Sequence, residues 1–251
     1  MISLRGKRAL VTGGSRGIGA ETAMLLAECG ADVGIGFRSR DREAAEVAKR
    51  IADRGVRSFA QSSDLTLPNG ADALFERAVR EFGGLDIVVG NAGTWPVEEA
   101  GIGQMPDARW RTTLMHNLDA VFHTARSAAR VLGKGGRLVL VSSTAGQRGE
   151  AYHADYAAAK GATIAFVKSL AIELAQRDIT VNSVAPGWVD TEMIADVMGA
   201  GGRERIAAGI PIGRIASARD IAWPIVFLCS DEARHITGEI LNVNGGSVLC
   251  G

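Results

Sequence analysis

The chain has 251 residues, of which 47% are hydrophobic and 22% are charged, a balance typical of a globular protein with a substantial core. Its 28 basic residues equal its 28 acidic residues, so the charge gives no reason to expect a nucleic-acid partner or an anionic membrane surface. No apolar run is long enough to span a membrane, and residues 1–8 lead into an apolar strand without a signal peptide's hydrophobic region. We therefore expect a cytoplasmic protein.

The cysteines also fit a reduced, cytoplasmic setting. Cys29, Cys229 and Cys250 are odd in number and far apart in the sequence. The chain has no CxxC pair and no cluster of cysteines with histidines. We therefore expect neither a disulfide framework nor a metal site.

A glycine-rich segment follows the first predicted strand, residues 8–12. The segment Gly13-Gly-Ser-Arg-Gly-Ile-Gly19 leads into a predicted helix, residues 20–29, which Gly30 ends. Glycines at such a turn allow close backbone approach, and the free N–H groups of the following helix can bind a pyrophosphate. The spacing is Gly-x-x-x-Gly-x-Gly. The alternative is a glycine-rich turn that binds nothing.

Strands and helices alternate along the rest of the chain. Further strands are expected at 31–37, 56–61, 85–89, 137–141, 179–184 and 239–243, and further helices at 41–54, 71–82, 107–132, 156–176 and 218–229. This alternation predicts an α/β fold with a doubly wound, mostly parallel seven-stranded sheet and helices on both faces. No linker or repeat interrupts the pattern, so residues 1–251 are expected to form a single domain.

Polar or glycine residues come directly after six of the strands. After the glycine segment these are Arg38-Ser39, Asp64, Asn91-Ala-Gly93, Ser142-Ser143 and Pro186-Gly187. In a doubly wound sheet, ligands bind at the carboxyl ends of the strands. The six strand ends therefore predict one continuous groove.

Tyr156 and Lys160 open the helix that follows Ser143. Side chains four residues apart share one face of a helix, so the phenol and the ammonium lie within reach of each other. A lysine charge at this distance is expected to lower the phenol's pKa from about 10 and to make it a proton donor and acceptor near neutral pH. Taken alone, the pair also fits the amphipathic edge of an ordinary helix.

Together these motifs resemble the short-chain dehydrogenase/reductase family over essentially the whole chain. The matching residues are Thr12-Gly-Gly-Ser-Arg-Gly-Ile-Gly19, Asn91-Ala-Gly93, Asn117, Ser143, Tyr156-x-x-x-Lys160, Pro186-Gly187-x-x-x-Thr191 and Asn242-Val-Asn-Gly-Gly246. One departure is Gly90, where many members have an asparagine. The resemblance implies a Rossmann-like fold and hydride transfer between a nicotinamide and a carbonyl or alcohol carbon.

The resemblance also implies roles for four catalytic residues. Tyr156 would exchange the proton with the substrate oxygen. Lys160 would lower the pKa of that tyrosine and bind the nicotinamide ribose. Ser143 would polarise the substrate oxygen. Asn117 would hold a water that links Lys160 to solvent.

The end of the second predicted strand favours NADP(H) over NAD(H). An NAD site places a carboxylate there, but the chain has Phe37 followed by Arg38, and Asp32 lies too early in the strand. Arg38 and Arg16 are expected to clamp a 2′-phosphate, unless both are solvated surface charges. By the resemblance, the residues expected to bind the cofactor are Gly13, Ser15, Arg16, Gly17, Ile18, Gly19, Arg38, Ser39, Asp64, Leu65, Asn91, Ala92, Gly93, Tyr156, Lys160, Pro186, Gly187, Val189 and Thr191.

The substrate is expected to be a small or carrier-linked carbonyl compound. Residues 188–216 contain several glycines and are expected to form a lid, and Trp95, His153 and Trp188 are candidate pocket residues. The closest subgroup resemblance is to 3-oxoacyl-acyl carrier protein reductases, and sugar or small-alcohol dehydrogenases are the alternative. A non-catalytic nucleotide sensor would be expected to have lost Tyr156, Lys160 or Ser143.

Two expectations concern partners. Arg126, Arg130 and Lys134 share one face of a long predicted helix, and Arg177 ends the next one. These cations either receive an acidic carrier protein or form a solvated basic face. The family resemblance also implies a homotetramer, built partly on those two helices.

Overall fold

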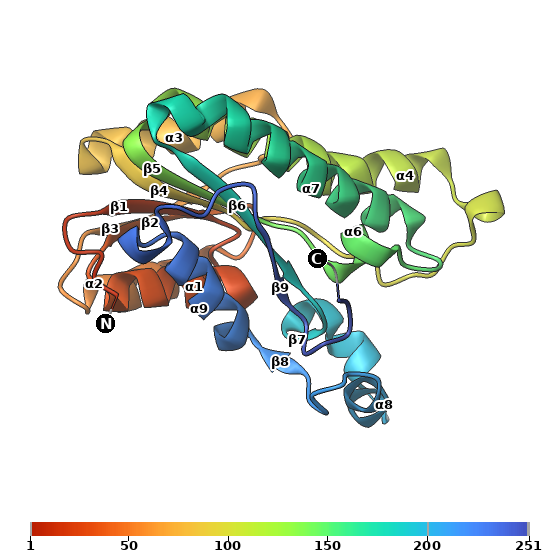
Figure 1. Cartoon of the computed structure of the whole chain (residues 1–251). Coiled ribbons are helices and arrows are strands. Elements are labelled where there is room, and N and C mark those ends of the chain that lie inside the picture. Colours follow the sequence, from red (N-terminus) through yellow and green to blue (C-terminus); the bar gives the residue numbers. More distant parts are fainter. Residues whose placement is uncertain (1, 200, 250–251) are drawn as a thin grey trace.

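Seven parallel strands form the central layer of the computed structural model, which describes residues 2–199 and 201–249 (Figure 1). Their spatial order is β3-β2-β1-β4-β5-β6-β9. The bounds are Arg8–Thr12 for β1, Asp32–Phe37 for β2, Ser58–Ser62 for β3, Leu85–Gly90 for β4, Leu132–Val141 for β5, Thr180–Pro186 for β6 and Ile240–Val243 for β9. The predicted seven-stranded, doubly wound sheet is confirmed. Cys250, named above, lies outside the described residues.

Helices cover both faces of the sheet and enclose one apolar core on each side (Figure 1). One face carries α1 (Gly17–Glu28), α2 (Asp41–Ala52) and α9 (Ala218–Leu228). The other face carries α3 (Pro68–Phe82), α5 (Ala120–Val131) and α7 (Ala154–Leu174). The strands between them are buried on both sides, which explains why they are apolar runs rather than alternating patterns.

Local sequence signals set several helix ends. Proline begins α3, where its missing N–H costs nothing, and Gly83 ends this helix with φ of 80°. A capping box starts α9, because the Ser217 hydroxyl accepts from the Asp220 amide and the Asp220 carboxylate accepts from the Ser217 amide. The first and last of these signals begin a helix, and Gly83 ends one where the chain turns back to the sheet.

The predicted helix 107–132 is divided into three parts. It consists of α4 (Asp107–Leu114), a π-helical turn η2 (Met115–Asp119) and α5. Residue periodicity cannot reveal a π turn, which inserts a single wider turn into a continuous helical pattern. Asn117 lies in this turn.

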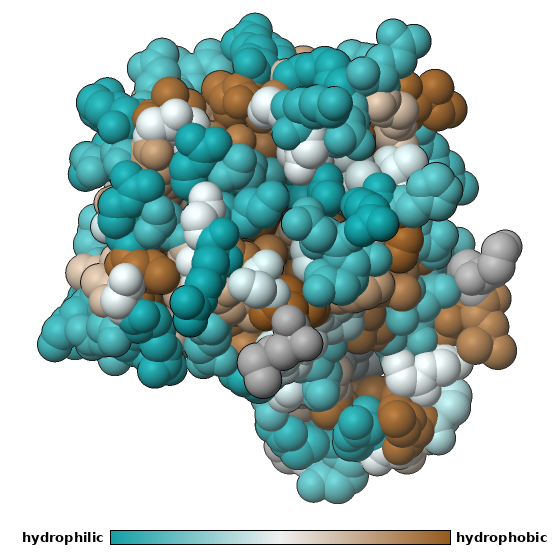
Figure 2. Space-filling model, turned by 60° about the vertical axis from the view of Figure 1, so that its left-hand side comes forward, coloured by the Kyte–Doolittle hydropathy of each residue, from teal (hydrophilic) through white to brown (hydrophobic). Residues whose placement is uncertain are grey.

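Several short elements were absent from the sequence prediction. They are η1 (Ile102–Gln104), α6 (Thr144–Arg148), β7 (Val189–Asp190), β8 (Ala216–Ser217) and η5 (Asp231–Ala233). η3 (Ala175–Arg177) ends the predicted helix 156–176, and η4 (Glu192–Met198) and α8 (Gly202–Ala208) lie in the predicted lid. β7 and β8 pair in parallel as a separate small sheet. The segment around α8 projects below the sheet layers, and Figure 2 shows apolar patches within a mostly hydrophilic surface.

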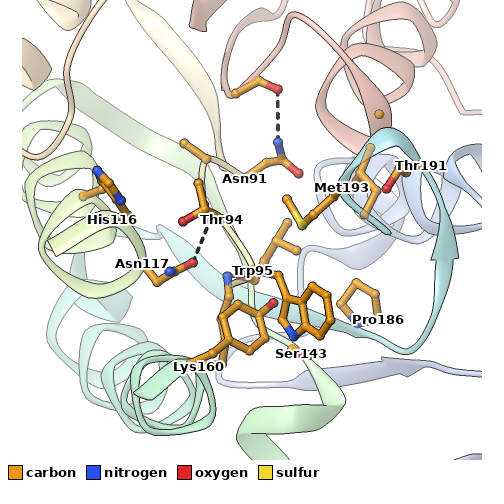
Figure 3. A pocket seen from close by; sticks show the side chains of 18 of the residues that line it. Asn91, Thr94, Trp95, His116, Asn117, Ser143, Lys160, Pro186, Thr191 and Met193 are labelled. Atoms are coloured by element: carbon orange, nitrogen blue, oxygen red, sulfur yellow. Dashed lines mark hydrogen bonds between the residues drawn. The ribbon is translucent and has the colours of Figure 1, made fainter. Parts of the chain in front are cut away.

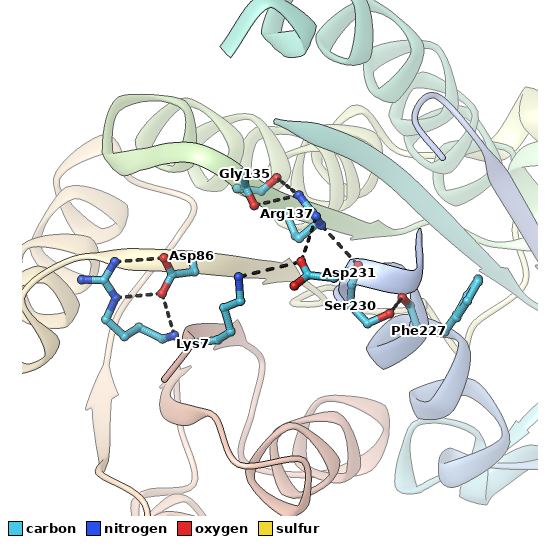
Figure 4. A network of polar contacts seen from close by, with 9 residues as sticks. Lys7, Asp86, Gly135, Arg137, Phe227, Ser230 and Asp231 are labelled. Carbon is cyan, nitrogen blue, oxygen red and sulfur yellow. Dashed lines mark hydrogen bonds and ion pairs between the residues drawn. The ribbon is translucent and has the colours of Figure 1, made fainter. Parts of the chain in front are cut away.

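Buried and half-buried ion pairs hold the amino ends of the strands (Figure 4). Arg8 at the start of β1 makes a bidentate contact with Asp86 in β4, at 2.8 and 2.9 Å. The buried guanidinium of Arg137 donates to the Gly135 carbonyl at 2.7 Å and to Asp231 at 3.3 Å. This network lies at the amino ends of the strands. It therefore leaves the edge formed by their carboxyl ends free for a ligand. Within residues 2–199 and 201–249, no helix is long and apolar enough to cross a membrane.

Candidate active site

One crevice collects the residues that follow β1, β2, β3, β4, β5 and β6. It opens where the strand order reverses between β1 and β4, the usual ligand position in this architecture. All the predicted cofactor residues line it except Gly19. Gly19 lies beneath the loop, where a Cβ would come within 2.2 Å of the Gly13 carbonyl oxygen. Its role is therefore to let the turn close.

The glycine loop presents an uncapped helix end to the crevice. Gly13 and Gly17 have φ of 66° and 54°, which favour glycine. α1 has no side-chain cap at Arg16 and no acidic residue in its first turn. Its first N–H groups are therefore free for an anion at the positive end of the helix dipole. This arrangement fits a pyrophosphate.

Asn91 fixes that loop to the sheet (Figure 3). Its side-chain amide donates to the carbonyls of Thr12 and Gly13, at 3.1 and 3.3 Å. The Thr12 hydroxyl in turn accepts from the amides of Asn91 and Ala92, both at 3.1 Å. The contacts hold the ends of β1 and β4 in one rigid unit, with glycine at position 90.

Cationic residues surround the end of β2. Arg38 and Arg40 line the crevice with Arg16, and Arg38 Nη1 lies 2.7 Å from His116 Nε2. The Arg16 guanidinium pairs with Glu192 of η4 at 2.8 Å. These groups suit a phosphate better than a pair of ribose hydroxyls.

Asp32 does not serve this end of β2. It lies at the other end of the strand, where its carboxylate pairs with Arg57 at 2.7 Å. A carboxylate that does lie near Arg38 is Asp64, which follows β3. It accepts a hydrogen bond from the Thr66 hydroxyl at 2.7 Å. Those Thr66 hydrogen bonds, and the nearby charges of Arg38 and His116, hold the pKa of Asp64 below its usual range.

The four predicted catalytic residues come together on the other side of the crevice. Figure 3 labels three of them, Asn117, Ser143 and Lys160. Ser143 caps α6 and shares a hydrogen bond with the Tyr156 phenol. Lys160 Nζ donates to the Val141 carbonyl at 2.9 Å and lies 5.6 Å from the centre of the Tyr156 ring. Two hydroxyls and one ammonium therefore converge at the carboxyl end of β5.

Asn117 is fully buried beside this group. Its amide donates to the Thr113 carbonyl at 3.0 Å, and its carbonyl accepts from the Thr94 amide at 3.1 Å. A Cβ on Gly93 would lie 2.8 Å from Asn117 Oδ1 and 3.5 Å from Lys160 Nζ. Gly93 therefore leaves the space in which Asn117 and Lys160 approach each other.

The expected lowering of the Tyr156 pKa is wrong. Burial raises the pKa of the phenol, the Ser143 hydrogen bond opposes the rise and the Glu150 charge adds to it. Burial also lowers the pKa of Lys160 to about 8. Desolvation therefore dominates the pKa of both groups and favours the neutral form of each.

Two tryptophans form part of the wall at the substrate end of the crevice. Trp95 and Trp188 both line it, with ring centres 6.0 Å apart in an edge-to-face arrangement. His153 stacks on Trp95 at 4.6 Å, and its ring supports that wall instead of lining the crevice. Two of the three predicted pocket residues therefore line the crevice, and the third supports one of them.

The sequence prediction missed several lining residues. They include Arg40, Thr94, His116, Arg148, Glu150 and Met193. His116 and Thr94 adjoin predicted residues and were within reach of the same motif reasoning. Glu150 and Met193 carry no motif, and only the path of the chain brings them to the crevice.

The predicted basic face is partly used inside the chain. The Arg177 guanidinium donates to the carbonyls of Ala129 and Leu132. Arg130 pairs with Asp72 at 3.4 Å, and Arg126 lies 5.0 Å from the ring centre of Phe122. The predicted lid, 188–216, contains β7, η4, α8 and the start of β8, and its Ala200 lies outside the described residues.

Comparisons with known proteins agree with this geometry. A family model described as enoyl-(acyl carrier protein) reductase matches residues 13–247. The chain is 40% identical to the 3-oxoacyl-[acyl-carrier-protein] reductase FabG of Vibrio cholerae over 250 residues, covering 99% of this chain and 100% of that protein. It is also 40% identical to the enzyme of the same name from Escherichia coli, again covering 99% and 100%.

Solved structures resemble the whole chain as well. A short chain dehydrogenase from Burkholderia cenocepacia in complex with NADP has a TM-score of 0.91 and 38% identity, covering 97% of this chain and 98% of that one. A dehydrogenase/reductase from Sinorhizobium meliloti has a TM-score of 0.93 and 34% identity, covering 98% and 97%. With the glycine loop, Ser143, Tyr156 and Lys160 in one crevice, the chain belongs to the short-chain dehydrogenase/reductase family.

Proposed function

We propose that this protein is an NADP(H)-dependent oxidoreductase that interconverts a carbonyl and a secondary alcohol, with a 3-oxoacyl thioester as the substrate class. The observation that carries the proposal is the hydrogen-bonded pair of Ser143 and Tyr156 hydroxyls beside buried Lys160. Two neutral O–H groups that point at one spot suit an oxygen that gains negative charge. The relatives named 3-oxoacyl-[acyl-carrier-protein] reductase support the choice of substrate.

The crevice fits NADP(H). The uncapped start of α1 would hold the pyrophosphate, and Arg16 and Arg38 the 2′-phosphate. Asp64 and Leu65 would lie against the adenine, with Val189 and Thr191 at the carboxamide. A solved neighbour that is 38% identical contains NADP, which supports the same cofactor here.

When bound, the nicotinamide supplies or accepts the hydride. Ser143 holds the substrate oxygen and Tyr156 gives its proton to that oxygen as charge develops, or takes it in the reverse direction. Lys160 is anchored by the Val141 carbonyl, so its charge stays next to the phenol. Asn117 is held by hydrogen bonds at both its side-chain oxygen and its side-chain nitrogen. It would keep the Lys160 ammonium accessible for proton exchange. The edge-to-face pair of Trp95 and Trp188 keeps water from the apolar side of the substrate.

The test is an NADPH-oxidation screen over acetoacetyl thioesters, sugars and small ketones, repeated with NADH. Acetoacetyl thioesters should give the highest kcat/KM, and NADPH should exceed NADH by at least tenfold, because charge-assisted contacts to one phosphate are worth about 1.5–3 kcal/mol. A preference for sugars would favour the dehydrogenase alternative. Equal kcat/KM with both cofactors would contradict the roles of Arg16 and Arg38. No turnover with any carbonyl, despite NADPH binding, would favour the nucleotide sensor.

We further propose a homotetramer in the cytoplasm. Large apolar side chains are exposed on the outer helices: Ile172 of α7 is 80% exposed, Phe122 of α5 43% and Trp223 of α9 41%. Contiguous exposed apolar surface is typical of subunit contacts, and Phe122 of α5 adjoins Phe166 of α7, with ring centres 6.5 Å apart. Light scattering after gel filtration should give about four times the 26.3 kDa of one chain. A mass near one chain would refute the tetramer.

The cytoplasmic setting and the carrier protein remain parts of this proposal. Cys29 and Cys229 are free thiols, as expected in a reducing compartment. Arg177 donates to backbone carbonyls, so it is not free to bind a carrier protein. Arg126 and Lys134 would then be the cations that contact an acidic carrier protein delivering the thioester.

A further inference from the structure

A carboxylate that no family motif includes lies at the substrate end of the crevice. Glu150 follows α6 and lines the crevice together with Ser143 and Tyr156. It is half-buried, and its charge is close enough to act on the Tyr156 phenol. Any substrate whose oxygen reaches Ser143 and Tyr156 therefore meets this side chain.

Its surroundings hold Glu150 in place. Trp95, which lines the same wall, is hydrogen-bonded to the carboxylate. Glu150 Oε1 lies 3.8 Å from His153 Nδ1, and the Glu150 carbonyl accepts from the His153 amide at 3.2 Å. His153 is 4% exposed and stacks on Trp95, so the three side chains form one packed unit. The carboxylate is thus kept facing the crevice.

Two cationic groups act on Glu150: the His153 ring at 3.8 Å, which is charged only when protonated, and the Arg148 guanidinium. Arg148 also lines the crevice, but it is exposed at the rim and makes no ion pair within 4 Å among the described residues. Asp155 pairs with Arg109 at 3.0 Å. Of the other lining carboxylates, Glu192 is paired with Arg16 and Asp64 is bonded to Thr66. At the substrate end the Glu150 carboxylate therefore opposes a substrate anion, whereas Lys160 and Arg148 attract one, and Glu150→Gln removes only the first of these effects.

Deepening the proposed function, on which it rests, we propose that Glu150 is a specificity-determining residue that selects neutral 3-oxo esters and thioesters over the free 3-oxo acids. In a 3-oxo acid, the carboxylate lies two carbons from the reacting carbonyl. With that carbonyl at Ser143 and Tyr156, the carboxylate is brought close to Glu150, and two like charges in a poorly hydrated crevice repel each other. A thioester or ester at the same place has no charge.

The repulsion should be large enough to measure. For two unit charges about 6–8 Å apart at an effective dielectric constant near 20, it corresponds to about 30- to 100-fold in affinity. The test compares acetoacetate with ethyl acetoacetate, measured as equilibrium binding to the enzyme–NADP⁺ complex by calorimetry. Binding to the oxidised cofactor needs no turnover, so the result is independent of the catalytic proposal.

The wild-type protein should bind the ester more tightly than the acid. Glu150→Gln keeps the shape and removes the charge, so the ratio of acid affinity to ester affinity should rise about 30- to 100-fold. Arg148→Gln is the matched control on the same loop: it removes a rim cation and should leave the ratio unchanged or lower it. An unchanged ratio in Glu150→Gln, equal wild-type binding of acid and ester, or failure of both to bind would overturn the inference.

A second arm uses pH. Burial raises the pKa of Glu150, against the opposing effects of His153, Trp95 and Arg148. Protonation of Glu150 as pH falls should therefore weaken the discrimination at pH values where a free substrate carboxylate, with an ordinary pKa near 4, is still ionised. Glu150→Gln should show a smaller pH dependence of the ratio. Failure of the NADPH screen with retained discrimination in binding would sink the proposed function but not this inference.

Discussion

Replacing Tyr156 with phenylalanine is expected to lower kcat by about 10²- to 10⁴-fold, the usual worth of a positioned proton donor. Phenylalanine keeps the ring that packs beside Lys160 Nζ, so the crevice should keep its shape. What is lost is the hydroxyl that shares a hydrogen bond with Ser143. Steady-state kinetics with saturating NADPH and the best substrate of the screen measures the loss.

The dissociation constant of NADPH is the control for Tyr156→Phe. It should change by less than about tenfold, because the phosphate-binding residues lie on the opposite side of the crevice. Ser143→Ala should also lower kcat, by about 10²- to 10³-fold, as expected for one lost donor at a developing oxyanion. Activity of Tyr156→Phe within tenfold of wild type would mean that another group carries the proton.

Asp155→Ala is expected to cost about 3–5 kcal/mol of the free energy of unfolding, measured by urea denaturation. Asp155 is fully buried at the start of α7 and pairs with Arg109 of α4 at 3.0 Å, and Arg109 is 15% exposed. It also accepts from the Thr113 hydroxyl at 2.8 Å. Alanine would leave a nearly buried guanidinium without its partner, which is the costly way to break an ion pair.

Two variants serve as controls for Asp155→Ala. Asp155→Asn keeps the shape and an acceptor for Thr113, so it should cost less than alanine. Glu81→Ala breaks the exposed pair with Arg77 on α3 and should cost about 0.5 kcal/mol or less. A similar small loss for Asp155→Ala would show that the buried pair contributes no more than a surface pair.

The same carboxylate predicts the direction of a pH effect. Burial alone would raise the pKa of Asp155, but hydrogen bonds from Arg109, Thr113 and the Tyr156 amide outweigh it and lower the pKa. A lowered folded-state pKa stabilises the protein above the unfolded value near 4, and that contribution is lost as pH falls through the folded value. As the pH falls below about 4, the free energy of unfolding of the Asp155→Asn variant should therefore decrease less than that of the wild-type protein.

Asp155 also links this stability to the active site. Thr113 binds Asp155 through its hydroxyl and Asn117 through its carbonyl. The π turn that holds Asn117 is thus tied to the start of the helix that carries Tyr156. Two elements that are distant in the sequence are fixed together next to the proton-transfer group.

Periodicity and turn chemistry in the sequence determined the architecture. Apolar runs such as β1, followed by glycines and helix formers, are local patterns, and local patterns predict elements and their order. In a doubly wound sheet the carboxyl ends of the strands lie along one edge. The sequence alone therefore assigns Gly13, Asn91, Ser143 and Pro186 to one crevice.

Only the tertiary structure decided the finer electrostatics. The Tyr156–Lys160 spacing indicates proximity on a helix, but the pKa of the phenol depends on burial, and burial is set by every segment packed around it. Glu150 reaches the crevice only because α6 and the following turn direct it there, and Trp95 and His153 hold it in place. A motif describes residues that are close in the sequence. The desolvation of a group and the effect of nearby charges depend on all the segments packed around it, and the spacing of residues within one segment does not contain that information.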